Sequence, residues 1–110
     1  MTKSKNMDID DVQYIIDRMK EGHIEAVLYG IKSDVPILNF NAVAYGAKYQ
    51  CHEKEFIDAL KNKFINSDIT FFGMEMKSFV IAALDVLNVQ KYTGNDTFIK
   101  QLITYKFQFY

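Results

Sequence analysis

The chain of 110 residues has little of what builds disulfide frameworks, sheets or phosphate-binding loops. It contains one cysteine, one proline and five glycines, and no tryptophan. Cys51 has no second cysteine with which to form an internal disulfide, and the two histidines, His23 and His52, lack the spacing of a metal site. The glycines never cluster, so the sequence contains no glycine-rich loop of the kind that binds phosphate. Because proline and glycine, the residues that interrupt helices, are scarce, the sequence favours long helices over the short strands of a sandwich or barrel.

The sequence also has no large excess of charge of either sign and no long apolar run. The formal net charge is −1, from 13 basic and 14 acidic residues, so there is no strong field to recruit nucleic acid or a charged membrane. No apolar stretch approaches the roughly 18 residues of a membrane span, and the start, Met1 to Asn6, is polar and carries lysine. We therefore expect a cytoplasmic protein with neither nucleic acid nor membrane as partner.

Apolar residues, 49% of the chain, recur with helical spacing from end to end. We expect one all-α domain over residues 1–110 with about six helices. The first is capped by Asp8 and closed by Gly22, and the second spans Ile24 to Ile31. Ser33 or Asp34 is expected to cap the third, with Pro36 in its first turn.

The second half of the chain continues this pattern. The fourth helix is expected from about His52 to Ile65, and Ser67-Asp68 or the segment just beyond it should open the fifth. A break and a new cap over Tyr92 to Asp96 precede the sixth, which is expected to carry Phe98, Leu102 and Tyr105 as its apolar row. The fifth helix has the longest apolar row, formed by Met76, Phe79, Val80, Ala83, Leu84 and Leu87.

Short segments recur along the chain, which indicates an internal repeat of a helix, a tight Ser-Asp turn and a second helix. Such a pair of helices buries only one side and must stack on its neighbours. The recurring segments are Ile31-Lys-Ser-Asp34 with Ile65-Asn-Ser-Asp68, Ile24-Glu-Ala-Val27 with Ile57-Asp-Ala-Leu60, and Phe56 to Leu60 with Phe98 to Leu102. The extra residues between copies are expected to fall in turns.

On these segments the chain resembles the HEAT-like family of α-helical repeats over about residues 23–106. The resemblance implies antiparallel helix pairs stacked into a right-handed α-superhelix. The chain departs from the family in having two and a half units and in lacking its typical Pro and Arg positions. A compact orthogonal helical bundle is the alternative architecture.

Residues capable of catalysis are few, and we expect no enzyme activity and no cofactor. Cys51 and His52 are sequence neighbours, which point about 100° apart on a helix and cannot act as a thiolate–imidazole pair. The carboxylates at Asp10, Asp11, Glu53, Glu55 and Asp58 are explained by helix starts, where negative charge complements the helix dipole.

A partner-binding groove is the stronger expectation. In stacked pairs the second helices line a concave face, and residues opposite their core stripes look outward into it. The third and fifth helices then present two matching rows, and a polar groove containing one tyrosine suits protein recognition, although a merely solvated face is the alternative. The rows are Asn41, Tyr45 and Lys48, and Glu75, Ser78, Ala82, Asp85 and Asn88.

Phe71 and Phe72 precede the fifth helix, and they are expected either to pack beneath a turn or to form an exposed anchor. With the aromatic tail of Phe107, Phe109 and Tyr110 they also raise self-association as a second possibility, so the chain is expected to be a monomer or a weak homo-oligomer.

The length and the helical repeat also resemble bacterial immunity proteins of polymorphic or contact-dependent toxin systems. That resemblance implies a protein that binds a cognate toxin domain, often a nuclease, and occludes its active site. Acidic side chains such as Glu75 and Asp85 would then mimic phosphates against a basic site. A self-associating structural or regulatory adaptor is the alternative function.

Overall fold

The computed structural model describes residues 9–108, which fold into helices and one short hairpin. The all-α prediction is confirmed in its main feature, since helices dominate the described chain. In chain order the elements are α1 (Ile9–Lys20), α2 (Ile24–Lys32), α3 (Pro36–Lys48), α4 (Lys54–Ala59), the π-helical segment η2 (Leu60–Phe64), β1 (Thr70–Phe71), β2 (Met74–Glu75), α5 (Met76–Val86) and α6 (Thr97–Tyr105).

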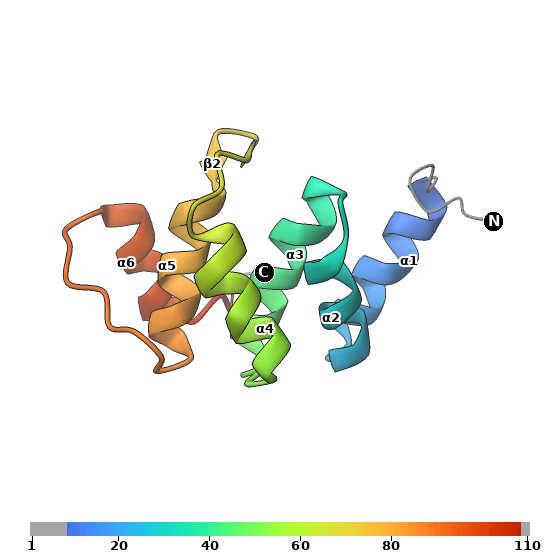
Figure 1. The fold of residues 1–110 in the computed structure, drawn as a ribbon, viewed down its shortest axis with the longest axis horizontal. Helices are drawn as coiled ribbons and strands as arrows, with labels where there is room; N and C mark the ends of the chain where they lie inside the picture. The colour runs from blue at the N-terminus through green and yellow to red at the C-terminus, as the bar shows by residue number, and fades with distance from the viewer. Residues whose placement is uncertain (1–8, 109–110) are drawn as a thin grey trace.

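The helices follow one another along the long axis of a molecule measuring 45 × 26 × 25 Å (Figure 1). α2 packs against α3, and η2, which continues α4, packs against α5. The two pairs meet where α3 contacts α5 and α2 contacts α4. α1 covers α2 and α3 at one end, and α6 covers α5 at the other.

α3 is the central helix, and its neighbours enclose it. From Leu38 to Ala47 every residue is buried except the half-buried Asn41, because α1, α2, α5 and β1 all contact this helix. Its sequence is apolar on all sides, which is typical of a helix buried on all sides. The buried amide of Asn39 is satisfied, since its nitrogen donates to the carbonyl oxygens of Gly30 and Ser33 at 2.8 and 2.9 Å.

Four helices end in the same way, with a residue of positive φ followed by a residue whose backbone N–H donates to the carbonyl five residues back. This is the Schellman arrangement, which satisfies carbonyl groups at a helix end. The positive-φ residues of α1, α3, α5 and α6 are Gly22, Gln50, Asn88 and Lys106. The bonds are His23 to Arg18, Cys51 to Gly46, Val89 to Leu84, and Phe107 to Leu102. Of these ends, the sequence predicted that of α1, at Gly22.

The other two helical segments, α2 and α4–η2, end in a serine turn. The Ser33 hydroxyl oxygen accepts from the Val35 N–H at 2.9 Å, and the Ser67 oxygen accepts from the Ile69 N–H at 3.0 Å. Ser33 therefore closes α2 and does not cap α3, whose first flanking residue is Val35 without a side-chain cap. The expectation of Ser33 or Asp34 as that cap is wrong. The two kinds of helix end alternate from α1 to α5, which is a two-helix periodicity in the backbone itself.

A π-helical turn accounts for a one-residue difference between the two copies. Ile24 and Ile31 are seven positions apart in the first copy, whereas Ile57 and Ile65 are eight apart in the second. The Ile65 N–H donates to the Leu60 carbonyl, a bond that spans five residues and so places one extra residue in the turn. The extra residue was expected in a turn between helices. At this point it lies instead within the helix.

The segment before α5 also differs from the expectation. The start at Ser67-Asp68 is wrong, and α5 begins beyond it, at Met76, because Thr70 to Glu75 forms an antiparallel hairpin with Phe71 opposite Met74. Its expected apolar row is buried throughout, from Met76 to Leu87. No helix of the described residues combines the length and the apolar character that crossing a membrane requires.

The last helix is capped as expected but rotated. The Asp96 carboxylate accepts from the Ile99 N–H at 3.0 Å. Ile99 and Leu102 are buried, whereas Phe98 and Tyr105, expected on the inner face, are 36% and 58% exposed. The expected cap of the first helix, Asp8, lies outside the described residues.

Deleting Asn62 is expected to leave the fold intact. This exposed residue lies within η2, and its removal changes the spacing of the buried Leu60 and Phe64 from four to three, which keeps both on one face of an α-helix. Deleting Ile81 from α5 should instead unfold the protein, because it turns Leu84 and Leu87 about 100° away from Phe79. Circular dichroism melting of both deletions checks this. Equal loss of helix in the two variants would contradict the assignment of the extra residue to η2.

Candidate partner-binding site

The residues expected to form one wall of the polar groove lie on the enclosed helix α3. Tyr45 is 3% exposed, and burial raises the pKa of its hydroxyl. Its ring stacks on Tyr49 at 6.4 Å, and the Lys48 amine lies 5.6 to 5.9 Å from both ring centres. The Asn41 amide donates to the Ile37 carbonyl of its own helix. The prediction that Tyr45 faces outward into a groove is wrong, because α1 and α2 cover α3 on the side away from α5.

The second expected row does not form a continuous wall. Ala82 is fully buried, and Ser78 is half-buried. The Asp85 carboxylate accepts from the Tyr92 N–H at 2.8 Å, which ties the loop before α6 to α5. Asn88 is exposed and supplies the positive-φ residue that ends α5. α3 and α5 do lie side by side as expected, but through their buried sides, so the proposed groove is not present between these rows.

The hairpin before α5 places Phe72 far out in solvent. Phe72 is 89% exposed, the highest exposure among the large hydrophobic residues of the described chain. Phe71 beside it is half-buried, and the two ring centres lie 4.5 Å apart. Phe71 therefore packs beneath the turn, whereas Phe72 is exposed.

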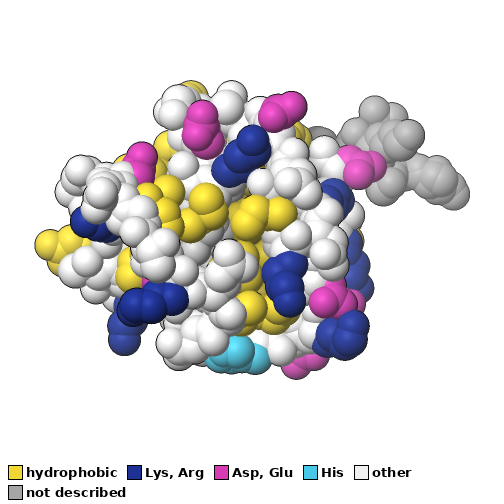
Figure 2. Space-filling model, turned by 60° about the vertical axis from the view of Figure 1, so that its left-hand side comes forward, with side chains coloured by type: hydrophobic (Ala, Val, Ile, Leu, Met, Phe, Trp, Pro, Cys, Tyr) yellow, Lys and Arg dark blue, Asp and Glu magenta, His cyan; other side chains and the backbone are white. Residues whose placement is uncertain are grey.

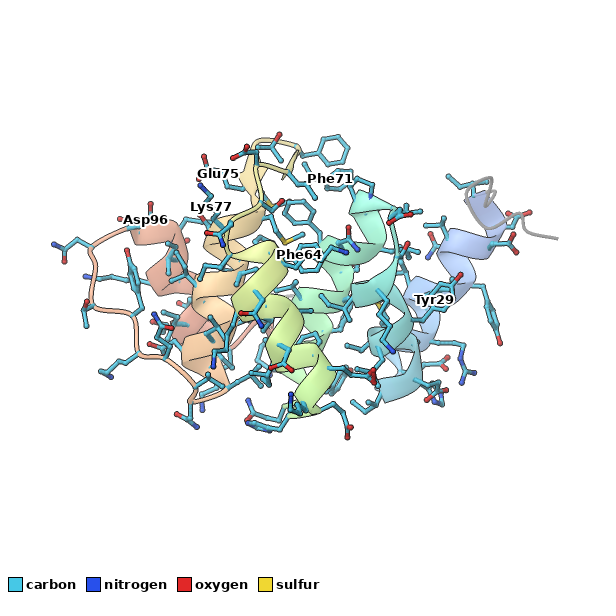
Figure 3. All side chains as sticks on the ribbon, viewed as in Figure 1. Tyr29, Phe64, Phe71, Glu75, Lys77 and Asp96 are labelled. Atoms are coloured by element: carbon cyan, nitrogen blue, oxygen red, sulfur yellow. The ribbon has the colours of Figure 1, made fainter. Side chains whose placement is uncertain are left out.

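A row of aromatic rings connects the tip of the hairpin to the core. From Phe72 the contacts pass to Phe71, then to Phe40 of α3 at 5.7 Å, and then to Phe79 of α5 at 5.3 Å. Figure 3 shows Phe71 at the hairpin, above the bundle. Because Phe40 and Phe79 are buried, the hairpin is held in place by the core, and Phe72 is presented on a supported element.

The backbone at the tip is unfavourable for the residue that occupies it. Phe72 and Gly73 form a two-residue turn, with φ of 52° and 77°. This geometry belongs to type I′ hairpin turns, whose first position favours asparagine, aspartate or glycine. A bulky residue at positive φ is an outlier that costs of order 1–3 kcal/mol, and such strain clusters at functional sites. Phe72 thus combines backbone strain with almost no burial.

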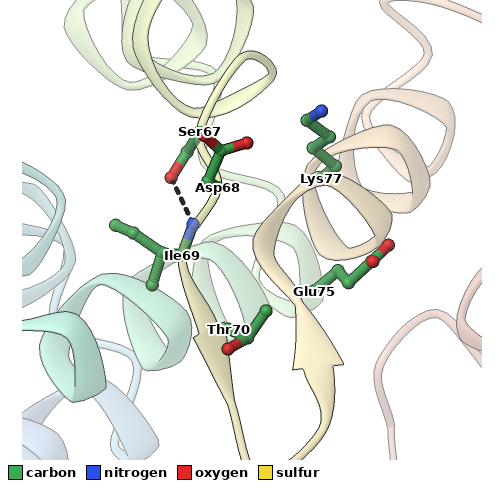
Figure 4. Close-up of a pocket in the computed structure, with 6 residues that line it drawn as sticks. All are labelled: Ser67, Asp68, Ile69, Thr70, Glu75 and Lys77. Atoms are coloured by element: carbon green, nitrogen blue, oxygen red, sulfur yellow. Dashed lines mark hydrogen bonds between the residues drawn. The ribbon is translucent and has the colours of Figure 1, made fainter.

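Polar side chains surround the base of the hairpin. Figure 4 shows Ser67, Asp68 and Thr70 on one side of a small pocket and Glu75 and Lys77 on the other. The pocket holds about 80 Å³, much less than the roughly 300 Å³ at which small-molecule sites begin. Asp68, Glu75 and Lys77 are exposed, and none takes part in an ion pair with another described residue. An aromatic anchor with a polar rim is typical of a protein interface.

Cys51 and His52 are engaged separately. Cys51 is 2% exposed, and burial raises the pKa of its thiol. The His52 ring nitrogens lie 3.1 and 3.0 Å from the carbonyl oxygens of Gln50 and Leu87. The imidazole therefore ties the loop after α3 to the end of α5. Within residues 9–108, no three His, Cys, Asp or Glu side chains lie close enough to hold a metal ion.

The C-terminal part of the molecule has its own apolar surface. Figure 2 shows hydrophobic side chains among charged ones on the face that includes α6. Exposed Phe98 contacts Phe79, with ring centres 6.0 Å apart. Phe107, expected in an aromatic tail available for association, is fully buried and also contacts Phe79. That expectation is wrong for Phe107, while Phe109 and Tyr110 lie outside the described residues.

Comparison of the chain with models of known protein families, with curated proteins and with solved structures finds no match in any of the three. Function is therefore inferred from the geometry of this chain.

The Cys51 thiol is expected to react slowly in the folded protein. Alkylation by iodoacetamide at neutral pH should be at least about a hundredfold slower than in urea, since reaction requires an opening of the core. A Cys51→Ala, Thr104→Cys variant, with its thiol on the exposed face of α6, should react at similar rates in both states.

Because the pKa of the Cys51 thiol is raised in the folded protein, the free energy of unfolding should also fall as the pH rises through the ordinary thiol range, where the unfolded chain ionises first. Rapid alkylation of native Cys51 would show an accessible nucleophile.

Replacing Phe72 by asparagine should stabilise the protein. Asparagine tolerates positive φ, so Phe72→Asn is expected to raise the free energy of unfolding by about 0.5 kcal/mol after the loss of the Phe71 ring contact. Phe72→Ile, which is β-branched, should lower it by about 1 kcal/mol. Urea denaturation of the three proteins measures both changes. Equal stability of the Asn and Ile variants would mean that the backbone at residue 72 is not strained.

Proposed function

We propose that this chain is a non-catalytic, cytoplasmic protein-binding domain of HEAT-like α-superhelical architecture. The alternating helix ends and the contacts between successive helix pairs support stacked repeats over an orthogonal bundle. We further propose that it is an immunity protein that binds and occludes a cognate bacterial toxin domain.

The exposed ring of Phe72, carried on a strained backbone, is the observation that supports the binding proposal. A ring that costs stability and buries almost nothing in the free protein gains its burial in a complex. Phe72 inserts into an apolar pocket of the toxin, and the core-anchored hairpin reduces the entropy lost on binding. Aromatic residues in such pockets are typical interface hot spots.

Asp68 and Glu75 give the proposal its charge specificity. Both carboxylates are exposed at the base of the hairpin, on either side of the small pocket. If the toxin is a nuclease, its active site is basic, and these carboxylates occupy positions that substrate phosphates would take. Glu75 keeps the role expected for it, whereas Asp85 holds the Tyr92 backbone instead.

Binding to the toxin domain encoded in the neighbouring reading frame tests the proposal. Phe72→Asn should weaken the complex by about thirtyfold or more, as loss of a hot spot of 2 kcal/mol predicts, although the free protein becomes more stable. Tyr105→Ser removes another exposed ring, from α6, and serves as the control. Calorimetric titration and rescue of toxin-expressing cells are the measurements. Unchanged affinity of the Phe72 variant, or a neighbouring frame unrelated to any toxin, would argue against this function.

Self-association is the second candidate, and the same exposed ring favours it. A homo-oligomeric adaptor would bury Phe72 against another copy of the chain. Sedimentation at millimolar concentration separates the two candidates, since a strict monomer excludes the adaptor. An oligomer that dissociates in Phe72→Asn but not in Tyr105→Ser would support it.

A further inference from the structure

A second surface lies between α1 and α2, away from the hairpin. Its cleft encloses about 550 Å³ and is lined mainly by apolar atoms. Tyr14 and Tyr29 stand in it with 62% and 48% exposure, and Figure 3 shows Tyr29 apart from the hairpin that carries Phe71. The lining residues are Asp11, Tyr14, Ile15, Arg18, Glu25, Ala26 and Tyr29.

The cleft follows from the position of α1 at the end of the stack. Ile16 and Met19 turn one side of α1 into the core, and beyond its outer side no further helix follows within residues 9–108. Ile15 and Ala26 form apolar surface between two adjacent helices. A shallow apolar trough between two helices is the shape that receives a third amphipathic helix.

An internal ion pair gives the cleft a fixed rim. The Arg18 guanidinium pairs with Glu25 across the turn and lies 5.8 Å from the centre of the Tyr14 ring. The backbone N–H of Glu25 and then the Arg18 guanidinium lower the pKa of the Glu25 carboxyl, which therefore stays ionised in mildly acidic solution. Arg18 is thus already occupied, and its charge is largely compensated.

Carboxylates outnumber cations around this cleft. The exposed outer row of α1 contains Asp10 and Asp17 with Tyr14 between them at helical spacing, and Glu21, 3.3 Å from the His23 ring, follows directly after the helix. Lys32, at the far end of α2, is paired with Glu55 of α4 at 2.5 Å. An acidic rim around an apolar trough repels nucleic acid and anionic membranes and attracts a cationic partner.

We infer that this cleft binds a basic amphipathic helix of a protein partner. An aliphatic side chain of that helix lies between Tyr14 and Tyr29, and flanking Lys or Arg side chains meet the carboxylates of the α1 row. Tyrosine rings suit both halves of this contact, since they supply apolar area and bind cations on their faces. The inference concerns a different face from the hairpin and does not depend on the toxin assignment.

Two synthetic peptides test the inference against the full 110-residue chain. Both are 18-residue amphipathic helices with the same leucine face, one with lysine and the other with glutamate as its polar residues. In amide NMR titrations the lysine peptide should shift residues around Ile15, Ala26 and Tyr29, and the glutamate peptide should bind at least tenfold more weakly. Equal binding of the two peptides, shifts centred on the hairpin, or no shifts at millimolar peptide would overturn the inference.

Variants separate specific docking from general attraction of a cationic peptide. Tyr14→Ser with Tyr29→Ser should weaken the lysine peptide about tenfold, and so should Asp10→Asn with Asp17→Asn. Tyr105→Ser on α6 and Phe72→Asn at the hairpin should leave its affinity unchanged. Thermal melts confirm that each variant is folded. Affinity insensitive to both tyrosine changes would show that the peptide does not use the cleft.

Discussion

The contacts of the Phe79 ring join the central helix α3 to the C-terminal part of the molecule. This ring meets Phe40 of α3 at 5.3 Å, Phe107 after α6 at 5.8 Å and Phe98 of α6 at 6.0 Å. Phe79 is thus the point where the central helix, the C-terminal helix and the segment after it converge. Removing a buried phenylalanine costs roughly 3–5 kcal/mol in a typical core, and here the loss would reach three elements at once. The hairpin depends on the same cluster, because Phe71 rests on Phe40.

Much of the fold is predictable from the sequence because helical spacing of apolar residues and helix caps are local signals. The apolar row of α5, the cap at Asp96 and the end of α1 at Gly22 were predicted correctly for that reason. α3 was misjudged because a strict amphipathic pattern was imposed on it. Leu38, Ala42 and Val43 make it apolar on all sides, which signals full burial. The hairpin was missed because its turn has phenylalanine where asparagine or glycine is the usual signal.

The candidate site was predictable only in part, and the reason is physical. Phe71 and Phe72 stood out as aromatic residues in a turn, but which of them faces solvent depends on the contact with Phe40 on another helix. Tyr45 and Asp85 were assigned to a groove by helical spacing alone, although their surroundings come from α1 and from the loop before α6. The cleft at Tyr14 and Tyr29 is formed by two helices together, and the spacing within either helix does not reveal it.

The π-helical turn at Leu60 to Phe64 bears on how such a chain tolerates changes in length. An added residue between two helices is usually thought to lengthen a loop, where it disturbs little. Here the longer copy keeps its serine turn, its helix pairing and its buried Leu60 and Phe64, and the surplus is taken up by one wider turn on the surface. Copies that differ by one residue therefore remain structurally equivalent, so comparison of units by fixed sequence period would overlook a match that the backbone preserves.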